Sequence, residues 1–599
     1  MPIALASPLM LRAGANFIAA MTSLPAKSWH SSNYAPQLCK NEAFEPRREE
    51  NLITKKANAA GMTRTGLRYR PKRLASAYDA IVIGSGMGGL TTAALLSDLG
   101  WKVCVLEQHY TAGGYTHSYE RNGYEWDVGV HYIGDVGAPT RTRRLFDYLS
   151  DGELKWAPMD DEYDRFYVGD KVFCAMAGKQ AFRDNLLRQF PHEQPAIDRY
   201  LALLGEVGSA LSSHSMARVL KPWQRSLAAP LIKWRRNETL YRSTWEVLSE
   251  LTDNADLIAV LCGQWGDMGA TPKRSAFLYH GMIARHYMYG GFYPVGGSWQ
   301  IAKTVIPRIQ RAGGEVFTYA NVQSIVIEEG KVRGVVMADG HRIDCDCVVS
   351  SAGISNTFER LMTPDVAAAA GYARKMVGVQ PSFAHLGVYI GLRQTAQELD
   401  LPRTNYWIYP HNDYDAAVEQ FLADPKAPFP VVYLSFPSAK DPDYLNRHPG
   451  TATIEVVAPA PYAWFERWQD STWGKRGDDY EAFKDALGER LMRYVYDKLP
   501  QLQGKVDYYE VSTPLSTNWF AGYGRGELYG LDHTVDRLQQ EWLGPRTRIE
   551  GLWLTGQDTL TCGVTGAMMS GMMTTMAMVG VRKFTPLMRR IDAQSRNPA

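Results

Sequence analysis

A glycine-rich turn near residue 85 carries the residue types and spacing that most clearly predict chemistry. A β-branched run at 80–83 leads into Gly84-Ser-Gly86-Met-Gly-Gly89, and an Ala- and Leu-rich stretch follows. This order of strand, G-x-G-x-x-G and helix is typical of the unit that binds the ADP half of a dinucleotide. Gly84 permits the tight turn, Gly86 lets the backbone approach a pyrophosphate, and Gly89 lets the helix pack close to the strand. We therefore predict that the N–H groups at the helix N-terminus face bound phosphates.

An acidic residue and two further glycines extend this predicted site. The second apolar strand, 102–106, ends at Glu107, whose carboxylate can accept hydrogen bonds from ribose hydroxyls. A carboxylate at this position disfavours a 2′-phosphate, which favours FAD or NAD over NADP. Gly113 and Gly114 come next, and we predict that they form a loop beneath the pyrophosphate and the flavin.

Two later segments are predicted to complete the dinucleotide site. A helix at 299–312 precedes a small antiparallel meander, whose strand at 322–328 begins with Val322 and is placed to contact an adenine through its backbone. The strand at 552–554 leads into Gly556 and Asp558, which suit the flavin ribityl chain and the second phosphate. A Met-rich helix then runs to residue 579.

The composition limits the class of protein. The chain has 599 residues, of which 45% are hydrophobic and 21% charged, so it can bury a large core. Its net charge of +2 gives no basis for expecting a nucleic-acid partner. The seven cysteines are scattered without metal-ligand spacing, so we expect no metal site and a reducing compartment. No run of 18 apolar residues predicts a transmembrane helix.

The pattern along the chain predicts an α/β protein that begins with a Rossmann-like dinucleotide-binding unit and has a mixed region of strands at 355–520. We expect a leader at 1–74, a core that starts near Ala75 and a tail at 586–599. Disorder without function is the favoured interpretation of the leader, and an organelle-targeting presequence or an over-extended reading frame are alternatives. The predicted segments are FAD-binding at 75–135, 289–356 and 546–585, and substrate- or membrane-binding at 136–288 and 357–545.

Two stretches predict the surroundings of a water-insoluble ligand. Residues 216–236 combine Leu, Ile and Trp with Lys and Arg and contain no acidic residue, and two prolines keep them from forming one long helix. The favoured interpretation is a patch that binds an anionic membrane surface, and a solvated basic surface is the alternative. The many aromatic residues between 355 and 520 fit an apolar tunnel for a long lipid as well as ordinary core.

Six stretches of sequence also carry a family resemblance. They read VLEQHYTAGGYTHSYERNGYEWDVGVHYIG (105–134), FYPVGGSWQIAKTVIPRIQRAGGEVF (292–317), SSAGISNTFERL (350–361), LSFPSAKDP (434–442), YAWFERW (462–468) and LWLTGQDTLTCGVTGA (552–567). With these stretches, which span roughly 75–585, the chain resembles the phytoene desaturase, carotenoid isomerase and retinol saturase group of FAD flavoproteins. The SFPSAKDP, YAWFERW and TGQDTLTCG motifs are the narrower marks of the retinol saturase branch.

This resemblance implies a two-domain, monotopic membrane flavoprotein, with a doubly wound, Rossmann-like FAD domain in three chain segments and an α+β mixed-sheet substrate domain. It implies the reduction of one double bond of a conjugated polyene lipid such as retinol or a carotenoid. It implies FAD as the cofactor, and by position it assigns FAD binding to Gly84, Gly86, Gly89, Glu107, Gly114, Val322 and Asp558. Two departures from the family pattern are visible. Residues 216–236 are less hydrophobic than expected, and Glu527 stands where a small residue is expected.

Saturation of a carbon–carbon double bond needs a hydride at one carbon and a proton at the other. The candidate proton donors are His131, Tyr132, Tyr293, Glu527 and Cys562, and the first choices are His131 and Tyr293 because both stand in glycine-flanked loops. The chain has no second G-x-G-x-x-G, so we expect electrons to arrive directly from NAD(P)H or from a redox partner. The alternative is a carotenoid or unsaturated acyl-lipid desaturase or cis–trans isomerase on the same scaffold, whereas the intact glycine set argues against a non-catalytic lipid escort.

Overall fold

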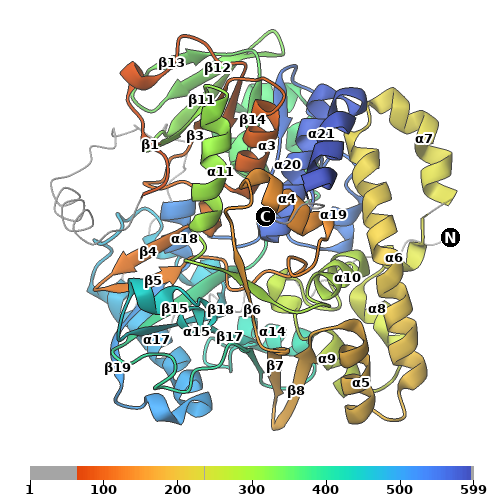
Figure 1. Cartoon of the computed structure of the whole chain (residues 1–599), viewed down its shortest axis with the longest axis vertical. Helices are drawn as coiled ribbons and strands as arrows, with labels where there is room; N and C mark the ends of the chain where they lie inside the picture. Colours follow the sequence, from red (N-terminus) through yellow and green to blue (C-terminus); the bar gives the residue numbers. More distant parts are fainter. Residues whose placement is uncertain (1–63, 235, 595–599) are drawn as a thin grey trace, which may run out of the picture.

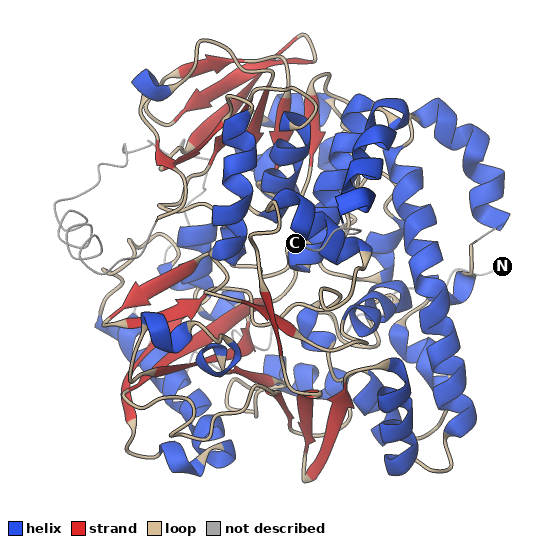
Figure 2. Cartoon of the chain, viewed as in Figure 1, coloured by secondary structure: helices blue, strands red, loops and turns tan. Residues whose placement is uncertain are grey.

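The computed structural model describes residues 64–234 and 236–594, which are built around two large β-sheets, one above the other in Figure 2. The upper sheet has six parallel strands in the order β1-β10-β3-β2-β14-β20. These strands are β1 (Leu67–Arg68), β2 (Ala80–Ile83), β3 (Val103–Leu106), β10 (Glu315–Thr318), β14 (Val348–Ser350) and β20 (Leu552–Leu554).

The upper sheet is covered on both faces, which explains its apolar strands. The sequences AIVI in β2 and VCVL in β3 are buried throughout, as expected for parallel strands between two layers. One face carries α3 (Met87–Ser97), α11 (Gln300–Arg311) and α20 (Gly563–Val579). The other carries the antiparallel meander β11 (Val322–Glu328), β12 (Lys331–Met337) and β13 (Arg342–Asp344). The predicted Rossmann-like fold is therefore confirmed.

Glycines let α3 pack directly on this sheet. A Cβ atom on Gly89 would lie 2.2 Å from the carbonyl oxygen of Gly84. A Cβ atom on Gly88 would lie 2.6 Å from backbone atoms of Gly556, which follows β20. Because backbone atoms cannot move aside as side chains can, a larger residue at either position would separate α3 from the strands. The close helix–strand contact predicted for Gly89 matches this geometry.

The lower sheet is mixed, as predicted. Its seven strands lie in the order β19-β15-β18-β17-β16-β7-β8, and all neighbours are antiparallel except β16 and β7. The strands are β7 (Glu162–Val168), β8 (Lys171–Met176), β15 (Ala384–Leu392), β16 (Asn405–Tyr409), β17 (Val432–Ser435), β18 (Ala452–Ala460) and β19 (Val506–Ser512). The long helix α17 (Asp478–Lys498) packs against this sheet.

A helical region lies along one edge of the molecule in Figure 1. It contains α5 (Lys179–Gln189), α6 (Gln194–Val219), α7 (Pro222–Trp234), α8 (Thr244–Ser249), α9 (Ala255–Leu261) and α10 (Phe277–His286). The predicted interruption within 216–236 lies just before Pro222, between α6 and α7, whereas Pro230 is inside α7. No helix in the described part of the chain is long and apolar enough to cross a membrane.

Three segments differ from the boundaries expected from the sequence. The core does not begin near Ala75, because β1 pairs with β10 at the edge of the upper sheet. Residues 586–594 of the expected tail belong to α21 (Val581–Gln594), whose Leu587 and Ile591 are buried against the upper sheet's helices. The helix α4 (Arg141–Leu149), expected in the substrate part, packs in the same cluster. Residues 1–63, most of the predicted leader, lie outside the described residues.

Candidate functional site

A cavity of about 2860 Å³ runs from the glycine-rich turn after β2 to the lower sheet. Ile83 and Leu106 line it at the upper sheet, and Tyr389 and Val457 line it at the lower sheet. Small-molecule sites usually measure roughly 300–1,000 Å³. The cavity therefore has room for a dinucleotide and a second, elongated ligand in contact with it.

Most of the residues predicted to bind a dinucleotide meet at the upper end of this cavity. The lining includes Gly84, Gly86, Glu107, Gly113, Gly114, Val322 and Gly556. These residues come from three chain segments and share one position, the carboxyl ends of the parallel strands and the loops that follow them. In open α/β sheets this is where ligands bind. Gly89 does not line the cavity and serves the helix packing described above.

The carboxylate of Glu107 is fixed by the turn that it faces. Its Oε2 accepts hydrogen bonds from the backbone N–H of Ser85, at 2.8 Å, and from the Ser85 hydroxyl, at 2.7 Å. Its Oε1 accepts one from the backbone N–H of His109, at 2.9 Å. The Ser85 hydroxyl in turn accepts from the N–H of Gly113, at 3.0 Å, so the acid ties the two glycine loops together. A carboxylate has about four acceptor positions, so capacity for ribose hydroxyls remains.

The shape of the turn fits a dinucleotide. A Cβ atom on Gly86 would meet no protein atom within 4 Å, so it would project into the cavity. Eight cavity-lining residues have a buried polar side-chain atom that lacks a hydrogen-bond partner among the described residues, and His109 Nε2, Thr561 Oγ1 and Thr565 Oγ1 are three of these atoms. Buried polar atoms are rarely left unpaired, so these atoms indicate a polar ligand. The residues present therefore fit FAD at this end.

Asp558 is placed differently from the sequence prediction. Its Oδ2 accepts a hydrogen bond from the backbone N–H of Ile354, at 2.8 Å, and its Oδ1 accepts from that of Leu531, at 2.9 Å. The side chain is buried and does not line the cavity. Asp558 thus joins two loops behind the wall, and its neighbours Gly556 and Gln557 line the cavity in its place.

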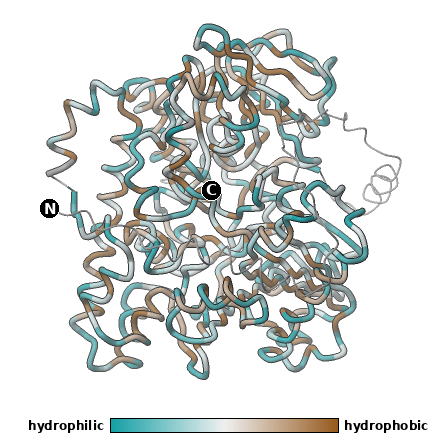
Figure 3. The backbone as a smooth tube through the Cα atoms, turned by 180° about the vertical axis from the view of Figure 1, so that it is seen from behind, coloured by the Kyte–Doolittle hydropathy of each residue, from teal (hydrophilic) through white to brown (hydrophobic). Residues whose placement is uncertain are grey.

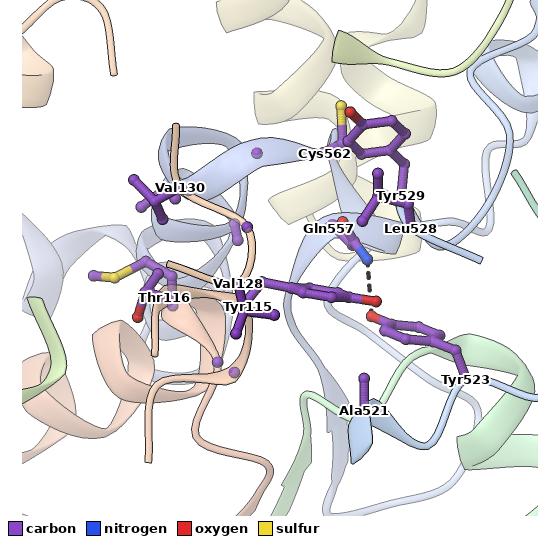
Figure 4. Close-up of a pocket in the computed structure, with 18 of the residues that line it drawn as sticks. Tyr115, Thr116, Val128, Val130, Ala521, Tyr523, Leu528, Tyr529, Gln557 and Cys562 are labelled. Carbon is purple, nitrogen blue, oxygen red and sulfur yellow. Dashed lines mark hydrogen bonds between the residues drawn. The ribbon is translucent and has the colours of Figure 1, made fainter. Parts of the chain in front are cut away.

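Two tyrosines form a flat pair beside the glycine loops (Figure 4). The rings of Tyr115 and Tyr523 are 6.1 Å apart between centroids and nearly parallel, at 9°. The Gln557 amide donates a hydrogen bond of 2.8 Å to the Tyr523 hydroxyl, drawn as the dashed line in Figure 4. Cys562 and Tyr529 lie together beyond them and also line the cavity.

The structure separates the candidate proton donors into two groups. His131, Tyr132 and Cys562 line the cavity, whereas Tyr293 and Glu527 do not. The Tyr293 hydroxyl is buried and donates to Asp127, which also accepts hydrogen bonds from Ser298. Tyr293 therefore faces away from the predicted reaction, contrary to its place among the first choices. The Glu527 carboxylate is buried and accepts from the backbone N–H of Arg525, at 2.9 Å.

His131 lies against a buried acid and a buried lysine. Its Nδ1 is 2.8 Å from Oε2 of Glu455, and Lys440 Nζ donates to its backbone carbonyl at 3.0 Å. Burial raises the pKa of Glu455 to about 8, although the Asp127 N–H and Lys440 act in the opposite direction. Burial lowers the pKa of His131 to about 3, with a contribution from Lys440. Burial also lowers the pKa of Lys440 to about 7, against the attraction of nearby acids.

The chain is similar in sequence to several known proteins. A model for an NAD(P)-binding Rossmann-like domain matches residues 82–149. All-trans-retinol 13,14-reductase of Homo sapiens is 38% identical over 537 residues, which cover 86% of this chain and 88% of that protein. The chain belongs to the all-trans-retinol 13,14-reductase family. The family resemblance of the six sequence stretches is thereby confirmed.

More distant proteins share the scaffold of the all-trans-retinol 13,14-reductase family. Chloroplastic prolycopene isomerase of Daucus carota is 25% identical over 510 residues, which cover 83% of this chain and 79% of that protein. A solved oxidoreductase structure from Methanosarcina mazei superposes with a TM-score of 0.52 at 18% identity, covering 82% of this chain and 98% of that one. At this identity the structural likeness shows a shared fold.

Sequence reasoning missed four ionisable residues beside Tyr132 and His131 in this family member: the half-buried Asp267, which lines the cavity, and the buried Asp164, Lys440 and Glu455 behind its wall. One signal was present for two of them. Glu455 interrupts an apolar strand, and Lys440 belongs to the SFPSAKDP motif, where it ends a short, mostly buried helix (Pro437–Lys440). A charged residue inside an apolar element is uncommon unless it is paired, so it marks a candidate site.

Proposed function

We propose that this protein is an FAD-dependent oxidoreductase that reduces one carbon–carbon double bond of a conjugated polyene lipid. The observation that carries the proposal is the continuity of the cavity, which joins a dinucleotide-type glycine turn to an aromatic chamber over the lower sheet. The chamber wall includes Tyr287, Trp407 and Tyr433. Flat aromatic walls suit an extended apolar molecule, and family membership supports the polyene class because the human relative is named for retinol.

FAD would be held by the loops at the carboxyl ends of the upper strands. We assign its phosphates to the turn at Gly84 and Gly86 and to the facing Gly114, its ribose to Glu107, and its adenine to the backbone at Val322. When bound, FAD supplies hydride-transfer chemistry that no side chain can provide. We propose that the reducing equivalents come from NAD(P)H or a redox partner. We also propose that the segments carrying these loops form one domain, extended at its ends to include β1 and α21.

His131 is the proposed source of the proton. Since the raised pKa keeps Glu455 protonated at neutral pH, its O–H donates to His131 Nδ1. The neutral imidazole then carries its own proton on Nε2, which makes no hydrogen bond with the described residues. Loss of the Nε2 proton to a substrate carbon and transfer of the Glu455 proton to Nδ1 would leave the ring neutral. His131 can thus deliver a proton in a site that disfavours an imidazolium ion.

We further propose that the protein sits on an anionic membrane surface through α7. Trp223 and Leu227 on this helix are 62% and 76% exposed, and Figure 3 shows hydrophobic and hydrophilic stretches alternating along it. The cavity reaches the protein surface near α7. Met216, close to the end of the preceding helix α6, lines the cavity and is 41% exposed. A ligand that leaves a bilayer could therefore enter between α6 and the Met-rich face of α20 without crossing water.

The decisive experiment mixes photoreduced holoenzyme anaerobically with all-trans-retinol, a carotenoid and a saturated lipid, and follows flavin absorbance and product mass. We expect the polyene to reoxidise the flavin and to gain two mass units. A product of unchanged mass and altered retention would identify an isomerase. Oxidised enzyme that instead removes two mass units from a more saturated lipid would identify a desaturase.

A further inference from the structure

The aromatic chamber contains an acid that the proposed reaction does not use. Asp267, at the end of a short 3₁₀ turn (Trp265–Asp267), lines the cavity. Besides Tyr132 and Asp164, it faces aromatic side chains. Tyr287, Tyr433 and Tyr529 lie close enough to interact with its charge, and Trp407 packs against the adjacent Gly266. A carboxyl group in such a wall is costly unless it is paired or serves a ligand.

The hydrogen bonds around Tyr132 determine which oxygen of the Asp267 carboxyl group can accept a hydrogen bond from a ligand. The Tyr132 hydroxyl lies 3.0 Å from Oδ2 of Asp164 and 3.1 Å from Oδ2 of Asp267. A tyrosine hydroxyl has one hydrogen, so it can donate to one acid and must accept a hydrogen bond from the other. One of the two carboxyl groups therefore carries a proton on the oxygen that faces Tyr132.

The protonated member of this pair is Asp267. Asp164 already accepts hydrogen bonds from Gln264, at 2.8 Å, and from Asn405, at 2.9 Å, and Lys440 donates to the same Asn405 side chain. These donors favour the charged form of Asp164. Asp267 has no such donors besides Tyr132, and burial together with the charge of Asp164 raises its pKa well above the usual range. The proton on Oδ2 leaves Oδ1 as a hydrogen-bond acceptor.

Oδ1 of Asp267 makes no hydrogen bond to any residue that the structure describes. We propose that this oxygen accepts a hydrogen bond from a hydroxyl group at the end of the substrate, so that the chamber selects a polyene alcohol. This inference takes from the proposed function only that the substrate is a polyene. An ether, an ester or a hydrocarbon of the same shape has no hydrogen to donate and would leave the acceptor unpaired. Asp267 is here a specificity residue and takes no part in the redox step.

The test measures equilibrium binding to the oxidised full-length holoenzyme, in which no turnover occurs. The probes are all-trans-retinol, its methyl ether and the hydrocarbon in which hydrogen replaces the hydroxyl, followed by quenching of tryptophan fluorescence. We expect the wild-type protein to bind the alcohol about tenfold more tightly than the ether, the effect of one buried hydrogen bond. Asp267→Leu should bind all three probes with similar affinity. Asp267→Asn should keep most of the preference, because its amide reproduces a donor toward Tyr132 and an acceptor toward the chamber.

The ratio of affinities within one variant does not depend on how much of the protein is folded. The exposed Asp253→Leu, which makes the same substitution outside the cavity, should keep the wild-type ratio. Equal wild-type affinity for alcohol and ether, or an unchanged preference in Asp267→Leu, would overturn the inference. Neither result would affect the proposed function, which fails only if no polyene reoxidises the reduced flavin.

Discussion

The imidazole of His131 and the carboxyl group of Glu455 lie 2.8 Å apart, although 324 positions separate them in the chain. The histidine lines the cavity, and the acid is 1% exposed behind it. The pair therefore connects the cavity wall to a buried carboxyl group on β18. Four predictions test this relationship and the site around it.

Replacement of Glu455 should change how stability depends on pH. The pKa of Glu455 is raised in the folded protein to about 8, so between its ordinary value and pH 8 the folded state holds one more proton than the unfolded state. Its contribution to the free energy of unfolding is therefore present below the ordinary pKa and is lost as pH rises toward 8, by up to about 1.4 kcal/mol per pH unit. Glu455→Gln, which cannot ionise, should remove this decline.

The measurement is urea unfolding of wild type and Glu455→Gln at steps from pH 5 to 8, compared as differences between the two proteins. The difference between the two proteins is read below pH 7, because the lowered pKa of Lys440 acts with the opposite sign above pH 7 and depends in part on Glu455. Parallel curves for the two proteins would show that Glu455 is not protonated in the folded state.

His131 and Tyr293 should behave differently when they are substituted. His131→Ala should slow anaerobic flavin reoxidation by polyene about 10²-fold or more, because it removes the proposed donor, and the flavin should stay bound. Tyr293→Phe should lower the free energy of unfolding by about 1–2 kcal/mol through loss of the hydrogen bond to Asp127, with little effect on the rate. Stopped-flow absorbance and urea unfolding distinguish the two effects. If Tyr293→Phe slowed flavin reoxidation while its free energy of unfolding stayed normal, Tyr293 would again be the candidate proton donor.

Substitution of two glycines of the same turn should have different effects, on cofactor binding in one case and on stability in the other. Gly86→Val should give a folded but colourless protein, since the side chain would project into open cavity where the pyrophosphate is proposed to lie. Gly89→Val should destabilise the fold by about 3 kcal/mol, because its Cβ would overlap the Gly84 carbonyl. Flavin absorbance and thermal unfolding of each variant check these outcomes. Gly524→Val, at an exposed position where a Cβ meets no atom within 4 Å, is the control. Full yellow colour in Gly86→Val would refute this placement of the cofactor.

The membrane proposal predicts loss of binding when α7 loses its exposed apolar side chains. Trp223→Ser combined with Leu227→Ser should weaken association with anionic vesicles at least about tenfold, because both side chains would be withdrawn from the lipid headgroup region. Charge reversal at Lys233, Arg235 and Arg236 should release the protein at low salt. Val172→Ser on β8, a 57% exposed apolar position, should have no effect. Unchanged co-sedimentation of the α7 variants would remove this helix from the proposal.

The sequence by itself determined the dinucleotide end of the molecule. The turn from Gly84 to Gly89, the acid Glu107 and the strands around them are consecutive, so local spacing encodes their geometry. Parallel strands also bring their carboxyl ends to one edge, which let Val322 and Gly556 be assigned to the same site from distant segments. The mixed second sheet was predicted from the family resemblance, because its central strands are buried on both faces and show no regular alternation of apolar and polar residues.

Only the tertiary structure decided which polar side chains face the substrate chamber. Tyr293 and Asp558 have suitable types and neighbours in sequence, yet their oxygens are taken by Asp127 in one case and by two backbone N–H groups in the other. Asp267 carries no local signal, and the charge of Glu455 within an apolar strand does not reveal its partner, because the partners Tyr132 and His131 come from another part of the chain. Burial and pairing set the proton on each group, and both arise from long-range packing that spacing along the sequence does not record.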